Sequence, residues 1–160
     1  MIEDISFGRE ILLGVGIGML FIVLNAKLGL VIGIPTLALS SEAEKAGARY
    51  IVAPLGEEMV FRSFLPFALA VIGIPFAFNL IINSVTFLIF HLSAYGGNFG
   101  ATSSLFIGAG LFAIVAFLAT YWQSSEDELQ IPIAAIIGHS IINLWLGAIE
   151  SGLIVAGAAA

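Results

Sequence analysis

The chain contains no cysteine, few charged residues and only two histidines. The absence of cysteine excludes disulfides, thiolate metal sites and a cysteine nucleophile. Charged residues make up 10% of the 160 residues, whereas soluble domains contain roughly 25%. Only five residues are lysine or arginine, and they form no basic patch. The composition therefore excludes an ordinary soluble domain and gives no reason to expect a nucleic-acid partner.

Long apolar segments account for most of what is present. Hydrophobic residues make up 60% of the chain, and the mean hydropathy is +1.12. This length accommodates about five spans of ~20 residues. We predict an all-α fold: a polytopic membrane helical bundle with about five transmembrane helices, forming a single membrane domain over residues 1–160. The predicted spans are Ile11–Ile34, Arg49–Pro66, Ile72–Leu92, Thr102–Trp122 and Pro132–Val155.

The first span is expected to be a retained helix, because the acidic N-terminus does not resemble the basic start of a cleaved signal peptide. Gly14 and Gly18 form a GxxxG spacing, which lets a helix approach a neighbour closely. We favour packing within the chain, and a homodimer is the alternative. The segment Leu28–Leu39 is interpreted as a broken continuation of this span, because Lys27 precedes it and it contains Pro35, and the polar segment Ser40–Lys45 is the predicted loop.

The orientation in the membrane is predicted from very few basic residues. Lys27, Lys45 and Arg49 would lie near one membrane face, and Arg9 near the other. The positive-inside rule then places the first loop in the cytoplasm. A cavity that opens near this loop would face the cytoplasm.

Three ionisable residues, Glu57, Glu58 and Arg62, interrupt the second apolar segment. Each charge inside a bilayer costs at least ~2.5–3.5 kcal/mol on insertion scales, so such a cluster is by default a functional-site hypothesis. Residues four apart share a helix face, and Glu58 can therefore pair with Arg62. Glu57 is left without a partner in its own helix. Because an unpaired carboxylate is a better base than one held in a salt bridge, Glu57 is the predicted general base.

The other polar candidates in apolar segments are His91, His139 and Asn143. Counted from the first-loop face at ~1.5 Å per residue, Glu57 lies ~12 Å deep, His91 ~5 Å, Asn143 ~14 Å and His139 ~20 Å. With ordinary tilt, all four can line one cavity. Taken singly, each has a structural interpretation, as an ion pair or an interhelical hydrogen bond. Three polar clusters at compatible depths favour one functional site.

Three motifs stand in order along the chain. They are Glu-Glu-x-x-x-Arg at Glu57, Glu58 and Arg62, Phe-x-x-x-His at Phe87 and His91, and His-x-x-x-Asn at His139 and Asn143. Together they resemble the CAAX protease and bacteriocin-processing (CPBP, or Abi) family of intramembrane proteases, which includes the Rce1-like prenyl-protein endopeptidases. The resemblance covers a catalytic core of about residues 53–147, preceded by one transmembrane helix at 11–34.

The resemblance implies a helical bundle with a conical cavity and a role for each motif residue. Glu57 and His91 would activate a water molecule, while His139 and Asn143 would stabilise the oxyanion. The remaining motif residues, Glu58, Arg62 and Phe87, would support the site. The family is often described as metalloproteases, and Glu57, His91 and His139 are the three ligands that a zinc ion would use. What is known of the prenyl-protein members favours a metal-free mechanism, which we adopt as the expectation.

The sequence thus predicts an intramembrane endopeptidase that cleaves a hydrophobic or lipidated peptide. Two alternatives stay open: a noncatalytic membrane scaffold or bacteriocin-immunity protein of the same fold, and a proton or ion conduit through Glu57, His91 and His139. Clustering in one half of the bilayer favours a one-sided cavity over a conduit. Only one span precedes the first motif, where many relatives have more. A dimer partner would then complete the cavity.

Overall fold

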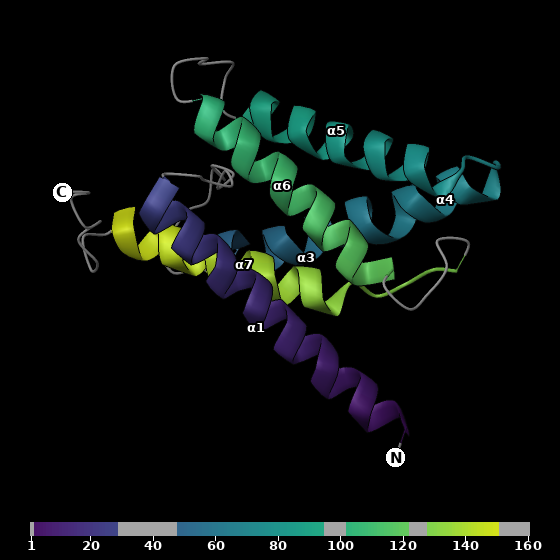
Figure 1. Ribbon diagram of the computed structural model, residues 1–160, viewed down its shortest axis with the longest axis horizontal. Helices are drawn as coiled ribbons and strands as arrows, with labels where there is room; N and C mark the ends of the chain where they lie inside the picture. Colours follow the sequence, from purple (N-terminus) through teal and green to yellow (C-terminus); the bar gives the residue numbers. More distant parts are fainter. Residues whose placement is uncertain (1, 29–47, 95–101, 122–127, 151–160) are drawn as a thin grey trace.

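The computed structural model describes residues 2–28, 48–94, 102–121 and 128–150, and every element in these ranges is a helix (Figure 1). The all-α prediction is confirmed for this part of the chain. The helices are α1 (Ile2–Leu28), the π-helical turn η1 (Ala48–Val52), α3 (Ala53–Met59), a second π-helical turn η2 (Val60–Phe64), α4 (Leu65–Val71), α5 (Phe76–Ala94), α6 (Thr102–Tyr121) and α7 (Ile133–Glu150).

The helix boundaries differ from the predicted spans where backbone chemistry overrides hydropathy. Helix α1 begins at Ile2 rather than at Ile11, since a helix can continue into polar residues. The second span continues without a break to Val71, beyond the predicted end at Pro66. The third helix begins at Phe76 and not at Ile72, because Gly73 adopts a positive φ of 84° and Pro75 follows it.

The other boundaries agree more closely. Helix α6 starts at Thr102 as predicted and is described to Tyr121, and the predicted end at Trp122 lies outside the described residues. Helix α7 begins directly after Pro132, whose fixed φ suits the first turn of a helix. The predicted ends of the first and last spans, and the proposed broken continuation after Leu28, lie outside the described residues.

One helix in the described part of the chain is long and apolar enough by itself to cross a membrane, at Phe7–Leu28. Three further apolar helices are shorter, at Phe76–His91, Ile107–Tyr121 and Ile133–Ala148. These three pack into one bundle with α1 and the Ala48–Val71 stretch. Polar side chains are buried on their inner faces, while many large apolar side chains face outward.

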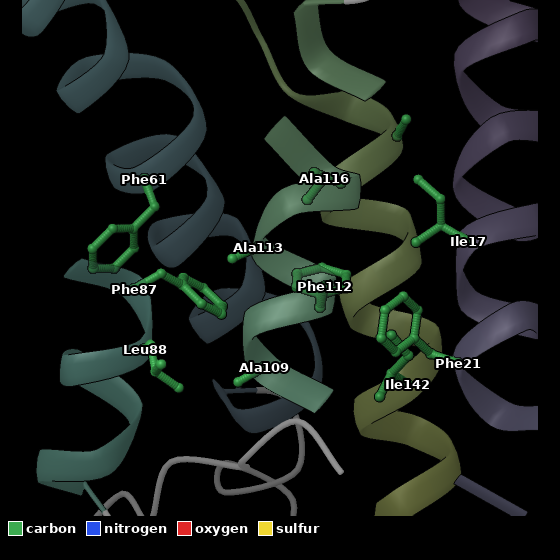
Figure 2. Packing of buried hydrophobic residues seen from close by; sticks show 12 residues of the cluster. Ile17, Phe21, Phe61, Phe87, Leu88, Ala109, Phe112, Ala113, Ala116 and Ile142 are labelled. Atoms are coloured by element: carbon green, nitrogen blue, oxygen red, sulfur yellow. The ribbon is translucent and has the colours of Figure 1, made fainter. Parts of the chain in front are cut away.

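Helix α1 packs along α7, and α5 packs along α6, so that the bundle is built from two helix pairs (Figure 1). The core between the pairs combines large rings with small side chains (Figure 2). Phe21 of α1 meets Phe112 of α6 edge to face, with 5.5 Å between ring centroids. Ala109, Ala113 and Ala116 are fully buried on α6. Their small side chains let α6 approach its neighbours closely.

The GxxxG spacing of α1 faces α7 and is used within the chain. A Cβ atom added to Gly14 would lie 2.7 Å from the Cβ of Ile137, and one added to Gly18 would lie 2.7 Å from Cγ2 of Ile141. Gly138 of α7 faces Ile17 in the same way, at 2.9 Å. The prediction that these glycines mediate packing within the chain is therefore confirmed.

This packing predicts a contrast between two neighbouring glycines. Gly18→Ala should destabilise the folded protein by ~1–3 kcal/mol, because the added methyl group overlaps a branched side chain on α7. Gly16→Ala is the matched control, since nothing lies within 4 Å of its added Cβ. It should be neutral, or stabilising by up to ~1 kcal/mol through helix propensity. Unfolding of both variants in detergent micelles would measure the difference, and equal effects would contradict the close contact.

Candidate active site

The helical stretch that carries the acidic residues is distorted at Val60–Phe64, directly after them. The N–H of Leu65 bonds to the carbonyl of Val60, five residues earlier, instead of to Phe61. Pro66 follows and has no N–H to donate. Both features free backbone carbonyls inside the bundle, where an unpaired polar group costs several kcal/mol. π-Helical turns of this kind are frequent at functional sites.

Side chains from two other helices satisfy the freed carbonyls. Asn83 of α5 donates a hydrogen bond from Nδ2 to the carbonyl of Phe61. Tyr121 of α6 donates its hydroxyl to the carbonyl of Arg62, over 2.9 Å. The distortion is therefore held in place by α5 and α6, and these contacts fix where the preceding acidic residues point.

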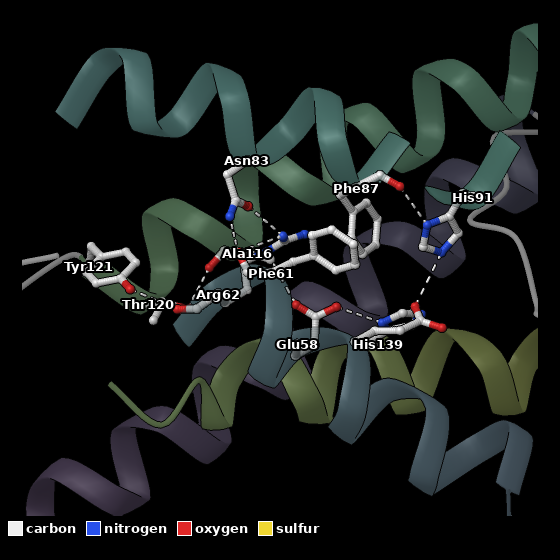
Figure 3. A network of polar contacts seen from close by, with 11 residues as sticks. Glu58, Phe61, Arg62, Asn83, Phe87, His91, Ala116, Thr120, Tyr121 and His139 are labelled. Carbon is white, nitrogen blue, oxygen red and sulfur yellow. Dashed lines mark hydrogen bonds and ion pairs between the residues drawn. The ribbon is translucent and has the colours of Figure 1, made fainter. Parts of the chain in front are cut away.

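Arg62 is fully buried and is held from three sides (Figure 3). Its Nε lies 3.3 Å from Oε2 of Glu58, which confirms the ion pair predicted from their spacing. Its Nη1 donates a hydrogen bond of 2.8 Å to Oδ1 of Asn83. The guanidinium carbon also lies 4.4 Å from the ring centroid of Phe87, a cation–π contact. Arg62 thus joins the acidic helix to α5.

Glu58 has a second partner that the sequence did not indicate. Its Oε1 accepts a hydrogen bond of 2.8 Å from Nδ1 of His139, on α7 (Figure 3). Glu58 therefore links Arg62 to His139 as well as neutralising the guanidinium charge. A carboxylate accepts but does not donate when ionised, so the His139 proton lies on Nδ1 and the opposite nitrogen, Nε2, points away from Glu58.

Glu57 points toward both histidines. Its Oε2 lies 3.4 Å from Nε2 of His91 and 3.9 Å from Nε2 of His139. The side chain of Glu57 is 7% exposed, that of His91 is 1% exposed and that of His139 is fully buried. His91 is oriented by its other nitrogen, because Nδ1 lies 3.0 Å from the carbonyl of Phe87, which can only accept. When each ring carries its single proton on Nδ1, both rings present an unprotonated Nε2 atom to the Glu57 carboxylate.

These three atoms form a cluster of hydrogen-bond acceptors. They all lie within 4.8 Å of one another. Acceptors at this separation repel one another unless a hydrogen-bond donor or a cation lies between them. A water molecule, which donates two hydrogen bonds, suits this position, and so does a metal ion. Either species would be held against a carboxylate that can take a proton.

An apolar groove of about 430 Å³ leads to Glu57 from the outside of the bundle. It lies between the helical stretch Val52–Phe61 and α5, and Glu57 is the polar residue on its lining. Its walls are Val52, Ala53, Gly56, Val60, Phe61 and Phe90. A groove of this size and character accepts an apolar group and brings it beside the Glu57 carboxylate.

The polar cluster falls within a single region that matches a known family. Residues 45–145 match a model of the type II CAAX prenyl endopeptidase Rce1-like family. The chain belongs to the Rce1-like family. This is a family of membrane-embedded proteases, so the protein is a membrane protein of a hydrolase family. Comparisons with curated proteins and with solved structures gave no match.

The remaining motif residues of the Rce1-like sequence also lie close to this cluster. Phe87 is fully buried, with its ring centroid 4.1 Å from that of His91 and 6.2 Å from that of His139. Asn143 is fully buried on α7, one helical turn after His139. The structure thus brings Glu57, Glu58 and both histidines into contact.

The sequence analysis missed Tyr121 and two supporting asparagines, Asn79 and Asn83. The two asparagines are fully buried on α5, four residues apart and therefore on one helix face. Asn79 donates from Nδ2 to the carbonyl of Pro66, over 2.8 Å. Their spacing within an otherwise apolar helix could have identified them, because an asparagine in such a helix needs a hydrogen-bond partner.

The acceptor cluster also fits a catalytic zinc site. Three protein ligands with one open position are typical of catalytic zinc. Ligands ~2.1 Å from a tetrahedral ion lie ~3.4 Å from one another, and the Glu57–His91 and Glu57–His139 separations are 3.4 and 3.9 Å. The bond from His139 Nδ1 to Glu58 resembles the carboxylate contact that often orients a zinc-bound histidine.

Proposed function

We propose that this protein is a multi-pass intramembrane endopeptidase of the CAAX-processing type, which hydrolyses a peptide bond with a water molecule activated by Glu57 and His91. The observation that carries this proposal is the convergence of three acceptor atoms, Glu57 Oε2, His91 Nε2 and His139 Nε2. A water molecule bound there would donate its protons toward a carboxylate and an imidazole. Its oxygen lone pair would remain available for attack.

In the proposed reaction, the water oxygen forms a bond to the carbonyl carbon, and Glu57 takes one water proton. The carbonyl π electrons move to its oxygen, which becomes an oxyanion. The amide of Asn143 would donate a hydrogen bond to this oxyanion, and so would Nε2 of His139 after it takes a proton from solvent, a contribution of ~2.7–4 kcal/mol per donor in soluble hydrolases. The C–N bond then breaks, and Glu57 returns the proton to the leaving amine.

Glu58 and Arg62 would support this chemistry without touching the substrate. Oε1 of Glu58 lies 2.8 Å from Nδ1 of His139, where a carboxylate compensates the positive charge of the ring when it carries a second proton. Arg62 in turn pairs with Oε2 of the same carboxylate. This buried arrangement fixes the orientation of His139, and with it the direction from which the oxyanion would be stabilised.

The substrate we propose is a hydrophobic or lipidated peptide. The groove beside Glu57 is apolar except for that carboxylate, and Val52, Val60 and Phe90 on its walls are exposed to the outside of the bundle. An apolar segment or a prenyl chain could enter it from the bilayer. The cytoplasmic orientation of the cavity belongs to the same proposal and rests on the few basic residues of the first loop.

We propose the metal-free form of this mechanism. If the site binds zinc, Glu57, His91 and His139 would hold it, and the ion would supply Lewis-acid activation of the water. The metal-free form needs no further component, since Glu57 can accept the water proton itself. The two forms differ in their response to chelation, which gives a direct test.

Purified protein in micelles should cleave at least one member of a panel of membrane-anchored and prenylated peptides, and the rate should be unchanged by a chelator. Cleavage sites would be determined by mass spectrometry. The control is the same protein carried through the chelation step and then supplied with zinc. Loss of cleavage with chelator and its recovery with zinc would overturn the metal-free form. Folded protein that cleaves no peptide would favour the scaffold alternative.

A further inference from the structure

A second cavity lies between α1 and α6, and its lining shares no residue with the groove beside Glu57. Its volume is about 600 Å³, within the usual range for small-molecule sites. The walls are apolar, formed by Leu12, Leu13, Ile17, Val115 and Leu118. The two polar residues on the lining are neighbours in the sequence, Arg9 and Glu10.

We call this cavity the wedge, and its lining extends along α1 from Arg9 to Ile17. Helices α1 and α6 are in contact where Phe21 packs against Phe112, and Phe21 follows the cavity residue Ile17 by four residues on α1. Ile17 lies toward the closed end. Arg9 lies eight residues earlier on α1, ~12 Å along the helix axis. The wedge therefore has an apolar apex and a charged mouth, close to the end of the apolar stretch Phe7–Leu28.

The charged mouth carries one residue of each sign. Nη2 of Arg9 lies 3.2 Å from Oε1 of Glu10, and the side chains are 45% and 20% exposed. A phosphoethanolamine group also combines two opposite charges a short distance apart. Its phosphate suits a guanidinium, and its ammonium has three N–H donors for a carboxylate. A phosphocholine group has no N–H donor, and a phosphoglycerol group has no cation.

We propose that this wedge binds one phospholipid with a phosphoethanolamine headgroup. The headgroup phosphate lies against Arg9, its ammonium lies against Glu10, and an acyl chain runs between the two helices toward Ile17. The lipid covers apolar surface on a helix that is otherwise largely exposed, since only 22% of the apolar stretch of α1 is buried. This inference rests on the chain being a membrane protein and does not depend on proteolytic activity.

The test is native mass spectrometry of the delipidated protein in micelles. Ethanolamine, choline and glycerol phospholipids with identical acyl chains are added separately. We expect one ethanolamine lipid to bind with an affinity about tenfold higher than either of the others, equivalent to ~1.4 kcal/mol. Leu118→Trp fills the wedge and should weaken this binding at least about tenfold. Leu111→Trp is the matched control, because both leucines are 41% exposed on α6 and Leu111 is not part of the lining.

Arg9→Gln and Glu10→Gln should each lower the affinity for the ethanolamine lipid to the affinity for the choline lipid. Arg9 is exposed and Glu10 is half-buried, so thermal unfolding without lipid should change little. Three results would overturn the proposal: equal binding by Leu118→Trp and wild type, tighter binding of the glycerol lipid than of the ethanolamine lipid, and a dimer that Leu118→Trp dissociates. The last would assign the wedge to a second copy of the chain.

Discussion

Glu57→Gln should lower the cleavage rate by ~10³-fold while leaving the protein folded, within the ~10²–10⁴-fold range of general acid–base catalysis. Glutamine has the shape of glutamate but cannot accept a proton from water. Its amide can donate a hydrogen bond to Nε2 of His91 or His139, atoms that lie 3.4 and 3.9 Å from Oε2 of Glu57. The substitution therefore removes the proposed base and relieves the clustering of acceptors. Initial rates of peptide cleavage and thermal unfolding in micelles would measure both effects.

Glu128→Gln is the matched control for this experiment. Glu128 is an exposed carboxylate outside the polar cluster, and its contact is a 3.4 Å hydrogen bond from Gln130. Its replacement should change neither rate nor stability measurably. If Glu57→Gln cleaves peptides at the wild-type rate, water activation by Glu57 is excluded and the proposed mechanism fails.

Arg62→Met should destabilise the fold by ~3–5 kcal/mol, because removal of one partner from a buried ion pair leaves the other charge uncompensated. Glu58 would lose the guanidinium 3.3 Å from its Oε2, and Asn83 would lose the donor to its Oδ1. The methionine side chain has a volume similar to that of arginine, so the substitution mainly removes the positive charge and the hydrogen bonds of Arg62. The folded fraction during titration with a denaturing detergent would measure the loss.

Two further variants separate the charge effect from a general effect of the substitution. Arg9→Met removes an exposed guanidinium and should change stability by at most ~1 kcal/mol. The double variant Glu58→Gln with Arg62→Met removes both buried charges and should recover part of the lost stability. If Arg62→Met alone is as stable as the wild type, Glu58 does not depend on the guanidinium, and the described ion pair contributes nothing.

Contacts within one helix could be predicted from the sequence, and contacts between helices mostly could not. The spacing of Glu58 and Arg62 indicated their pairing directly, because helix geometry fixes which residues share a face. The same reasoning left Glu57 free to face other helices, where it meets both histidines. It did not indicate the bond between Glu58 and His139, since helix rotation in a bundle depends on the packing of every neighbour.

The departures from regular helix were also invisible to hydropathy. The residues of the π-helical turn at Val60–Phe64 do not differ in hydropathy pattern from an ordinary helix. The turn depends on hydrogen-bond donors that Asn83 and Tyr121 supply from other helices. The turn at Gly73 was predicted to lie inside a span because its neighbours are apolar. Hydropathy therefore located the helical regions, while hydrogen bonding decided where they bend and end.

The bond between Glu58 and His139 joins residues 81 positions apart, and this distance bears on how the protein is made. The ribosome synthesises the acidic helix well before α7, so Glu58 must enter the membrane with Arg62, four residues away, as its charge partner. Residues Glu57 and His91 would meet before His139 exists. A nascent chain at that stage lacks both proposed oxyanion donors, His139 and Asn143. Under the proposed mechanism, cleaving ability would therefore arise only when α7 has inserted beside the acidic helix.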